Sequence, residues 1–204
     1  MIVYLRLNIK NLIVMEPKQR NNVCRVEHAG ALDISLRKLV HDPHAILKPF
    51  IKDGMTVLDL GCGPGFFTME MAEIVGKRGK VTAADLQEEM LDIVRKKAAG
   101  TSLQSIIEYH KCESDKTGLS GIFDFVFVFY MLHEVSDQIV FLQEVHSLIK
   151  PDGKVLIVEP KFHVTKMDFN NSEAIMNKAG FEIIEKPKIF FSRSVLLKKR
   201  NPEK

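Results

Sequence analysis

Short apolar runs alternate along the chain with longer segments whose apolar residues recur at helical spacing. The runs are bounded by glycine, proline or acidic residues, a pattern that predicts buried β-strands. The expected strands are Thr56–Leu60, Lys80–Ala84, Ser105–His110, Phe123–Tyr130, Lys154–Glu159, Phe181–Lys186 and Ile189–Leu197. The segments with helical periodicity are Phe66–Val75, Leu86–Ala99, Val135–Ile149 and Lys166–Lys178.

The alternation of strands and helices predicts an α/β fold with a doubly wound, mostly parallel sheet. The run Phe123–Tyr130 is apolar at almost every position, as in a strand covered on both faces. Only Pro187-Lys188 separates the last two strands, which is too short for a parallel crossover, so we expect an antiparallel hairpin there. Phe190 and Phe191 are adjacent in that last strand, so one of them should lie in the core.

The residues before the first strand predict an appendage rather than part of the sheet. Ala31–Val40 and Pro43–Phe50 have the pattern of short helices, so we expect residues 1–44 to form an arm and a helical cap, and residues 45–204 the main domain. The segment Met1–Val14 is apolar but interrupted by polar residues, and Met15 is followed by a stretch that resembles a usual protein start. We therefore expect Met1–Val14 to be an extension or a loosely attached arm.

Composition excludes several classes of protein. A 46% hydrophobic and 27% charged chain is globular rather than disordered. A net charge of +3 is too small to predict a nucleic-acid partner, and no run is long enough to span a membrane. Three cysteines favour a reducing compartment over a disulfide framework, so we expect a cytoplasmic protein. Neither the three cysteines nor the histidines before the first strand, His28, His41 and His44, have the spacing of metal ligands, and no metal site is expected.

A glycine-rich loop lies between the first strand and the first helix. Gly61, Gly63 and Gly65 allow a tight turn and the close approach of a ligand to the backbone. The next strand ends in Asp85, whose carboxylate can accept hydrogen bonds from both hydroxyls of a ribose. The loop and this acidic residue together predict a nucleoside site. A phosphate-binding P-loop is excluded because no Lys-Ser/Thr pair follows the glycines, and a nicotinamide site is the weaker alternative because the spacing is not GxGxxG.

Five segments in order resemble motifs of the class I S-adenosylmethionine-dependent methyltransferases, closest to the small-molecule group that includes quinone-biosynthesis enzymes. They are Val57–Gly65, Ala83–Leu86, His110–Ser114, Phe123–Glu134 and Leu148–Lys154. The resemblance covers roughly residues 45–198 and implies a Rossmann-like sheet of seven strands in the order 3-2-1-4-5-7-6, with the last strand antiparallel. Two departures are that Glu113 stands where the family usually has Asp, and that the Asn/Asp-Pro-Pro-aromatic motif of enzymes that methylate nucleobases is missing.

The resemblance also implies S-adenosylmethionine as methyl donor, S-adenosylhomocysteine as product, and a set of cofactor-binding residues. Carried over residue by residue, that set is Asp59, Gly61, Cys62, Gly63, Gly65, Asp85, Leu86, Glu113, Ser114 and Tyr130. Asp59 is expected to hold the backbone amides of the loop, the amino group of the ligand, or both.

Transfer of a sulfonium methyl group needs mainly alignment and exclusion of water, with a base for acceptors that carry a proton. His133 follows the fourth strand and His163 the fifth, so both are candidate catalytic residues. We expect His133 to line the cofactor side and His163 to act as the acceptor-side base. Glu134 is expected to cap or anchor the helix that begins near Val135.

The sequence leaves several functions open. The leading hypothesis is methylation of an unidentified small molecule. Methylation of RNA or protein through the basic chain ends is the second, and a non-catalytic nucleoside-binding module is the third. The oligomeric state is not predicted.

Overall fold

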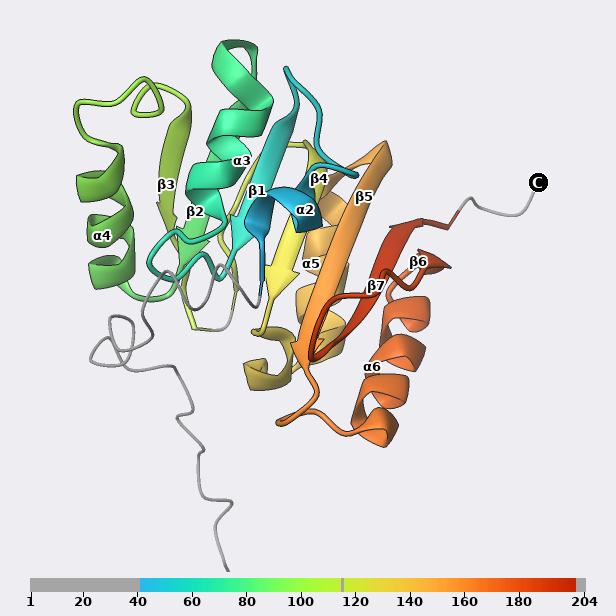
Figure 1. Ribbon diagram of the computed structural model, residues 1–204. Coiled ribbons are helices and arrows are strands. Elements are labelled where there is room, and N and C mark those ends of the chain that lie inside the picture. The colour runs from blue at the N-terminus through green and yellow to red at the C-terminus, as the bar shows by residue number, and fades with distance from the viewer. Residues whose placement is uncertain (1–40, 115, 201–204) are drawn as a thin grey trace, which may run out of the picture.

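The computed structural model describes residues 41–114 and 116–200, and they form a seven-stranded sheet with helices on both faces (Figure 1). The strand order is β3-β2-β1-β4-β5-β7-β6, as expected. The strands are β1 (Thr56–Leu60), β2 (Lys80–Asp85), β3 (Ile107–Lys111), β4 (Phe123–Phe129), β5 (Ile149–Pro160), β6 (Phe181–Glu185) and β7 (Ser192–Lys199). β7 runs antiparallel to both β5 and β6, and the other pairs are parallel, which confirms the predicted hairpin.

Two layers of helices cover the two faces of the sheet. In Figure 1, α2 (Pro43–Leu47), α3 (Thr68–Val75) and α4 (Glu88–Ala98) lie in front of the sheet, and α5 (Gln138–Leu148) and α6 (Lys166–Lys178) lie behind it. Short 3₁₀ turns occupy Gly76–Arg78 and Leu132–Glu134.

Alternate residues of each central strand pack into different cores. Phe125 and Phe127 of β4 belong to the core under α3 and α4, whereas Val126 and Val128 belong to the core under α5 and α6. All four side chains are at most 1% exposed. Burial on both faces explains why β4 is apolar at nearly every position.

Several element boundaries differ from the predictions. α5 begins at Gln138 instead of Val135, because the side chain of Asp137 accepts a hydrogen bond from the amide of Val140 at 3.2 Å and caps the helix. β5 extends back to Ile149 through Pro151-Asp152-Gly153, and its register with β4 shifts there, as in a β-bulge. Among the other differences, α3, α4 and β3 each begin two residues later than predicted, and α2 ends at Leu47 instead of Phe50.

The prediction for Phe190 and Phe191 is wrong. β7 begins only at Ser192, so both phenylalanines lie in the turn before it and are 61% and 58% exposed. Phe191 also has a positive φ of 50°, which a regular strand does not contain.

The crossover from β3 to β4 contains no helix in its described residues, 112–114 and 116–122. The carboxylate of Glu144 on α5 holds this segment by accepting hydrogen bonds from the amide and hydroxyl of Thr117 and from the amide of Gly118. The backbone carbonyl of Thr117 also bonds Nε2 of His110 on β3 at 2.8 Å. These polar contacts replace the packing that a crossover helix usually provides.

The predicted arm, including Met1–Val14, and the helix expected at Ala31–Val40 lie outside the described residues. The division of the chain at residue 44 therefore stays a prediction. Within the described part of the chain, no helix is long and apolar enough to cross a bilayer.

Candidate active site

The three loop glycines have distinct structural roles. Gly61, Gly63 and Gly65 have φ angles of 77°, 51° and 79°, a region that favours glycine. A Cβ added at Gly65 would lie 2.8 Å from Cγ2 of Val94, so this glycine lets the loop pack against α4. A Cβ added at Gly63 would meet no atom within 4 Å. Gly63 therefore borders the open space that a ligand can approach.

Asp85 joins the end of β2 to this loop. One oxygen of its carboxylate accepts a hydrogen bond from the amide of Gly63 at 2.8 Å, and the other accepts one from the amide of Gln87 at 2.9 Å. Burial raises the pKa of the carboxyl, and these amide hydrogen bonds oppose the shift. Each oxygen of a carboxylate can accept a second hydrogen bond, so Asp85 retains capacity for ligand hydroxyls. The neighbouring Leu86 is 42% exposed and offers an apolar surface beside it.

Asp59 lies inside the fold rather than on the loop surface. It is 2% exposed, and its carboxylate accepts a hydrogen bond at 2.6 Å from the hydroxyl of Thr68 at the start of α3. Burial raises the pKa of Asp59 to about 7, the Thr68 bond opposes the shift, and the charge of Asp85 adds to it. The structure thus gives Asp59 a helix hydroxyl as its partner, and its contact with a ligand stays a prediction.

Cys62 and Cys112 are buried free thiols. Burial raises the pKa of the Cys112 thiol to about 12, and raises that of Cys62 further, with Asp59 and Asp85 adding to it. Both side chains therefore stay protonated and act as small packing groups. Cys24 lies outside the described residues, and no cluster of metal-binding side chains occurs among the described ones.

The segment after β3 passes close to the end of β2, because the amide of Cys112 donates to the carbonyl of Asp85 at 2.8 Å. Glu113 and Ser114 follow and are exposed. The carboxylate of Glu113 lies 3.2 Å from the ammonium of Lys116, and its side chain is 64% exposed. The structure thus brings both residues near the ligand-facing edge without fixing their side chains there.

Tyr130 follows β4 with a positive φ of 57°. Its ring stacks on Phe129 at 4.0 Å between centroids. Its hydroxyl lies 2.7 Å from Oγ of Ser192 and 3.2 Å from Nε2 of His41. Tyr130 therefore connects β4 with the start of β7 and with His41, two residues before α2. Its predicted cofactor contact stays a prediction.

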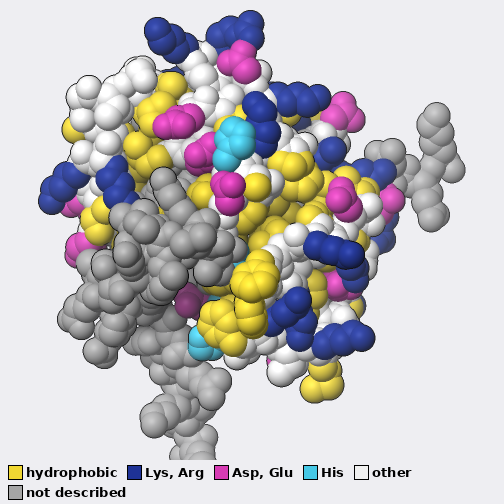
Figure 2. Space-filling view, in the orientation of Figure 1, with side chains coloured by type: hydrophobic (Ala, Val, Ile, Leu, Met, Phe, Trp, Pro, Cys, Tyr) yellow, Lys and Arg dark blue, Asp and Glu magenta, His cyan; other side chains and the backbone are white. Residues whose placement is uncertain are grey.

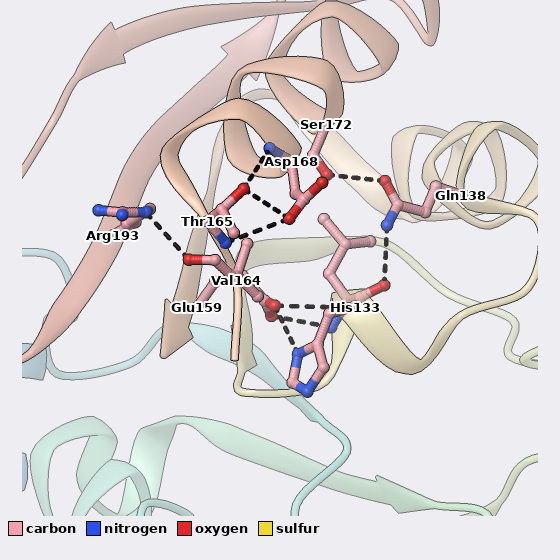
Figure 3. Close-up of polar contacts among 9 residues, drawn as sticks. His133, Gln138, Glu159, Val164, Thr165, Asp168, Ser172 and Arg193 are labelled. Carbon is pink, nitrogen blue, oxygen red and sulfur yellow. Dashed lines mark hydrogen bonds and ion pairs between the residues drawn. The ribbon is translucent and has the colours of Figure 1, made fainter. Parts of the chain in front are cut away.

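A histidine held by a buried carboxylate lies at the carboxyl ends of β4 and β5 (Figure 3). Glu159 is 2% exposed, and its carboxylate accepts hydrogen bonds from the amides of Leu132 and His133 at 3.0 and 3.3 Å. Nδ1 of His133 lies 2.5 Å from the same carboxylate. Because a carboxylate only accepts, Nδ1 carries the proton, and Nε2 is left as the basic nitrogen of the neutral ring. The hydrogen bond with Glu159 raises the pKa of His133.

The turn that carries His133 packs against the glycine loop. A Cβ added at Gly61 would lie 3.0 Å from Cγ of Met131, so the two segments touch. Burial raises the pKa of Glu134, and the charges of Glu159 and Asp85 contribute to the shift. The expected capping role of Glu134 is wrong, because Asp137 caps α5. The charge of Glu134 instead interacts with the His133–Glu159 pair and with Asp85 at the end of β2.

The structure brings the two predicted catalytic histidines together. The rings of His133 and His163 are parallel within 11°, with centroids 5.9 Å apart. His163 is exposed and lies next to Phe162, whose ring centroid is 4.8 Å away. The structure favours His133 as the base, because the buried carboxylate of Glu159 orients its ring. The sequence favours His163.

Comparison with known proteins supports the sequence resemblance. A family model described as a methyltransferase domain matches residues 51–190. The demethylmenaquinone methyltransferase of Oceanobacillus iheyensis is 31% identical over 109 residues, which cover 53% of this chain and 46% of that protein. The ubiquinone/menaquinone biosynthesis C-methyltransferase of Haemophilus ducreyi is 28% identical over 182 residues, which cover 85% and 69%. The aligned region thus spans less than half the length of the first of these relatives and about two thirds of the second.

A solved structure has the same fold over nearly its whole length. It is a SAM dependent methyltransferase from Aquifex aeolicus, with a TM-score of 0.76 and 30% sequence identity. The match covers 86% of this chain and 98% of that one.

Proposed function

Because the chain belongs to the class I S-adenosylmethionine-dependent methyltransferases, we propose that it transfers the donor's methyl group to a small molecule bound beside β4 and β5. The observation that carries the proposal is the hydrogen bond between Asp85 and the amide of Gly63. This bond joins the carboxylate proposed to bind the ribose, Asp85, to Gly63. Of the three loop glycines, Gly63 is the one with open space at its Cβ position.

The described residues fit the donor. Gly63 leaves room for close approach to the backbone, and Asp85 has unused acceptor capacity for the ribose hydroxyls. Leu86 supplies exposed apolar surface for the adenine ring of the donor. Glu113 and Ser114 follow the end of β3. When bound, S-adenosylmethionine supplies a methyl group already activated by the positive sulfur.

His133 is proposed as the base, with Glu159 as its positioning residue. The acceptor's nucleophilic atom forms a bond to the methyl carbon while the carbon–sulfur bond breaks and its electron pair stays on sulfur. The proton released by the acceptor goes to Nε2 of His133, and the buried carboxylate of Glu159 stabilises the resulting imidazolium. His163 is the alternative base.

A series of rings borders the acceptor side. The ring of Phe162 lies 6.2 Å from that of Tyr130 and 4.8 Å from that of His163, which in turn stacks on His133. Aromatic and apolar walls suit a planar acceptor of low polarity. Two of the similar proteins are named for demethylmenaquinone and for ubiquinone/menaquinone biosynthesis, so a demethylated quinone in its reduced form is the first acceptor to test.

The test measures donor consumption and product mass together. Incubation of the full chain with S-adenosylmethionine and reduced demethylmenaquinone should yield a product heavier by one methylene unit, with matching S-adenosylhomocysteine. RNA, protein extract and small-molecule extract fractions are assayed in parallel. Methylation confined to RNA or protein would reject the small-molecule acceptor, and donor binding without turnover on any fraction would reject catalysis. A cytoplasmic location is proposed with it, supported by the free thiols of Cys62 and Cys112.

A further inference from the structure

Large hydrophobic side chains are exposed at the carboxyl edge of the sheet, on and next to the acceptor side of the site. Phe162 follows β5 and is 69% exposed, and Phe190 and Phe191 precede β7 and are 61% and 58% exposed. Figure 2 shows hydrophobic side chains that stand out on this face beside Lys and Arg side chains. Isolated exposed apolar residues are ordinary, but a group of three aromatic rings at one edge is typical of an interaction surface.

The two loops that carry these rings are joined. The amide of Lys161 donates a hydrogen bond to the carbonyl of Phe191 at 3.0 Å. The rings of Phe190 and Phe191 pack edge to face, with 4.6 Å between their centroids. Phe191 holds a positive φ, a costly conformation for an aromatic residue. The exposed ring of Phe191 is therefore held in place at a conformational cost. We call Phe162, Phe190, Phe191, Lys161 and Lys188 the aromatic-basic patch.

The charges of the patch are positive and free of ion pairs within the described chain. Lys161 and Lys188 are exposed and line a shallow, open surface hollow together with Phe190 and Phe191. Neither lysine has a carboxylate within ion-pair distance among residues 41–114 and 116–200. By contrast, Lys186 in the same loop is paired with Glu173 at 2.7 Å. Protruding rings flanked by unpaired lysines complement a surface that is anionic outside and apolar beneath, which describes a bilayer with anionic lipids.

We propose that the aromatic-basic patch docks the protein on anionic lipid bilayers. The rings insert at the level of the headgroups while the two lysines contact lipid phosphates. The patch adjoins the acceptor side of the site, because the ring of Phe162 contacts both Tyr130 and His163. Docking itself does not depend on the proposed function. The idea that docking brings a lipophilic acceptor to the site does rest on the proposed function.

The test is sedimentation of the full chain with vesicles of phosphatidylcholine, with or without phosphatidylglycerol. Wild-type protein should bind the anionic vesicles and lose binding in high salt. The charge variant Lys161→Gln/Lys188→Gln and the ring variant Phe162→Ser/Phe190→Ser should each weaken binding about tenfold or more. The matched control, Ile122→Ser/Lys77→Gln, removes an exposed apolar side chain and an exposed lysine elsewhere and should bind like wild type.

Calorimetric affinity for S-adenosylhomocysteine, measured on every variant, reports an intact fold and judges the proposed function separately. No binding of wild-type protein to either vesicle would overturn the docking proposal. Binding that both patch variants retain at the control's level would also overturn it, because another surface would then be responsible. A self-association that disappears in the patch variants, without vesicle binding, would identify the patch as an interface between copies of the chain and reject the bilayer.

Discussion

Replacement of Glu159 by glutamine should remove the base while leaving the donor site intact. In the wild type, the carboxylate accepts hydrogen bonds from two backbone amides and from Nδ1 of His133. An amide side chain offers one accepting oxygen and one donating NH₂ group. The buried amide of Leu132 cannot change its role, so the new oxygen is expected to face it, and the NH₂ group then faces Nδ1.

This change reverses the tautomer of His133. Nδ1 must accept, so the proton moves to Nε2, which can no longer take a proton from the acceptor while the ring is neutral. General-base catalysis contributes about 10²–10⁴ in rate, and the Glu159→Gln variant should lose turnover in that range. The partly buried amide of His133 loses its acceptor, which should cost about 1 kcal/mol of unfolding free energy.

The pH dependence of turnover carries the same information. The base must be neutral, so wild-type kcat/KM should rise with pH through the pKa of His133, which Glu159 raises above its usual value near 6.5. In the Glu159→Gln variant the histidine pKa should fall. Nitrogen chemical shifts of labelled histidine, followed against pH, measure both the pKa and the tautomer without any acceptor.

Glu134→Gln is the matched control. Its charge also raises the pKa of His133, but as the smallest of the contributions, and it makes no hydrogen bond to Nδ1 among those of the described residues. It should lower the histidine pKa slightly and keep the Nδ1–H tautomer. The reasoning is refuted if Glu159→Gln leaves tautomer, pKa and turnover at the values of the control.

The remaining predictions concern the glycine loop, Asp59 and His163. Gly65→Ala places a Cβ 2.8 Å from Val94 and should lower the unfolding free energy by about 1–3 kcal/mol in denaturant titrations. Gly63→Ala should lower the unfolding free energy less and mainly weaken the binding of S-adenosylhomocysteine. Equal losses of stability would contradict the different roles of the two glycines. The pKa of Asp59 is about 7 in the folded state and 3.8 in the unfolded state, so the folding stability should fall as the pH rises from about 4 to 7. The Asp59→Asn variant should show a smaller fall of the urea midpoint over this pH range. An unchanged slope of midpoint against pH would show that Asp59 does not cause the fall. His163→Ala should lower turnover less than His133→Ala, and the reverse order would make His163 the base.

Much of the architecture could be predicted because local patterns determine it. β4 is apolar on both faces because both faces are covered, and the short Pro187-Lys188 connection allows only a hairpin. The proximity of Gly63 and Asp85 could also be predicted, because a glycine loop and an acidic residue at neighbouring strand ends must meet at one edge of a parallel sheet.

Other features depend on contacts between distant segments and could not be read locally. Glu159 is the last residue of the predicted strand Lys154–Glu159, but its partnership with His133 arises only when β4 and β5 pair. The contact of His41 with Tyr130 joins residues far apart in the sequence. Phe190 and Phe191 resemble strand residues, but they lie in the turn before β7, where Phe191 has a positive φ.

The most direct measurement of the central claim is calorimetric titration of wild-type protein and Asp85→Ala with S-adenosylhomocysteine and, separately, with NAD. The account predicts that wild-type protein binds S-adenosylhomocysteine and not NAD. The Asp85→Ala variant should bind it with an affinity lower by about 1–3 kcal/mol, a factor of roughly 5 to 150. Equal affinity of the two proteins, or a preference of the wild type for NAD, would contradict it.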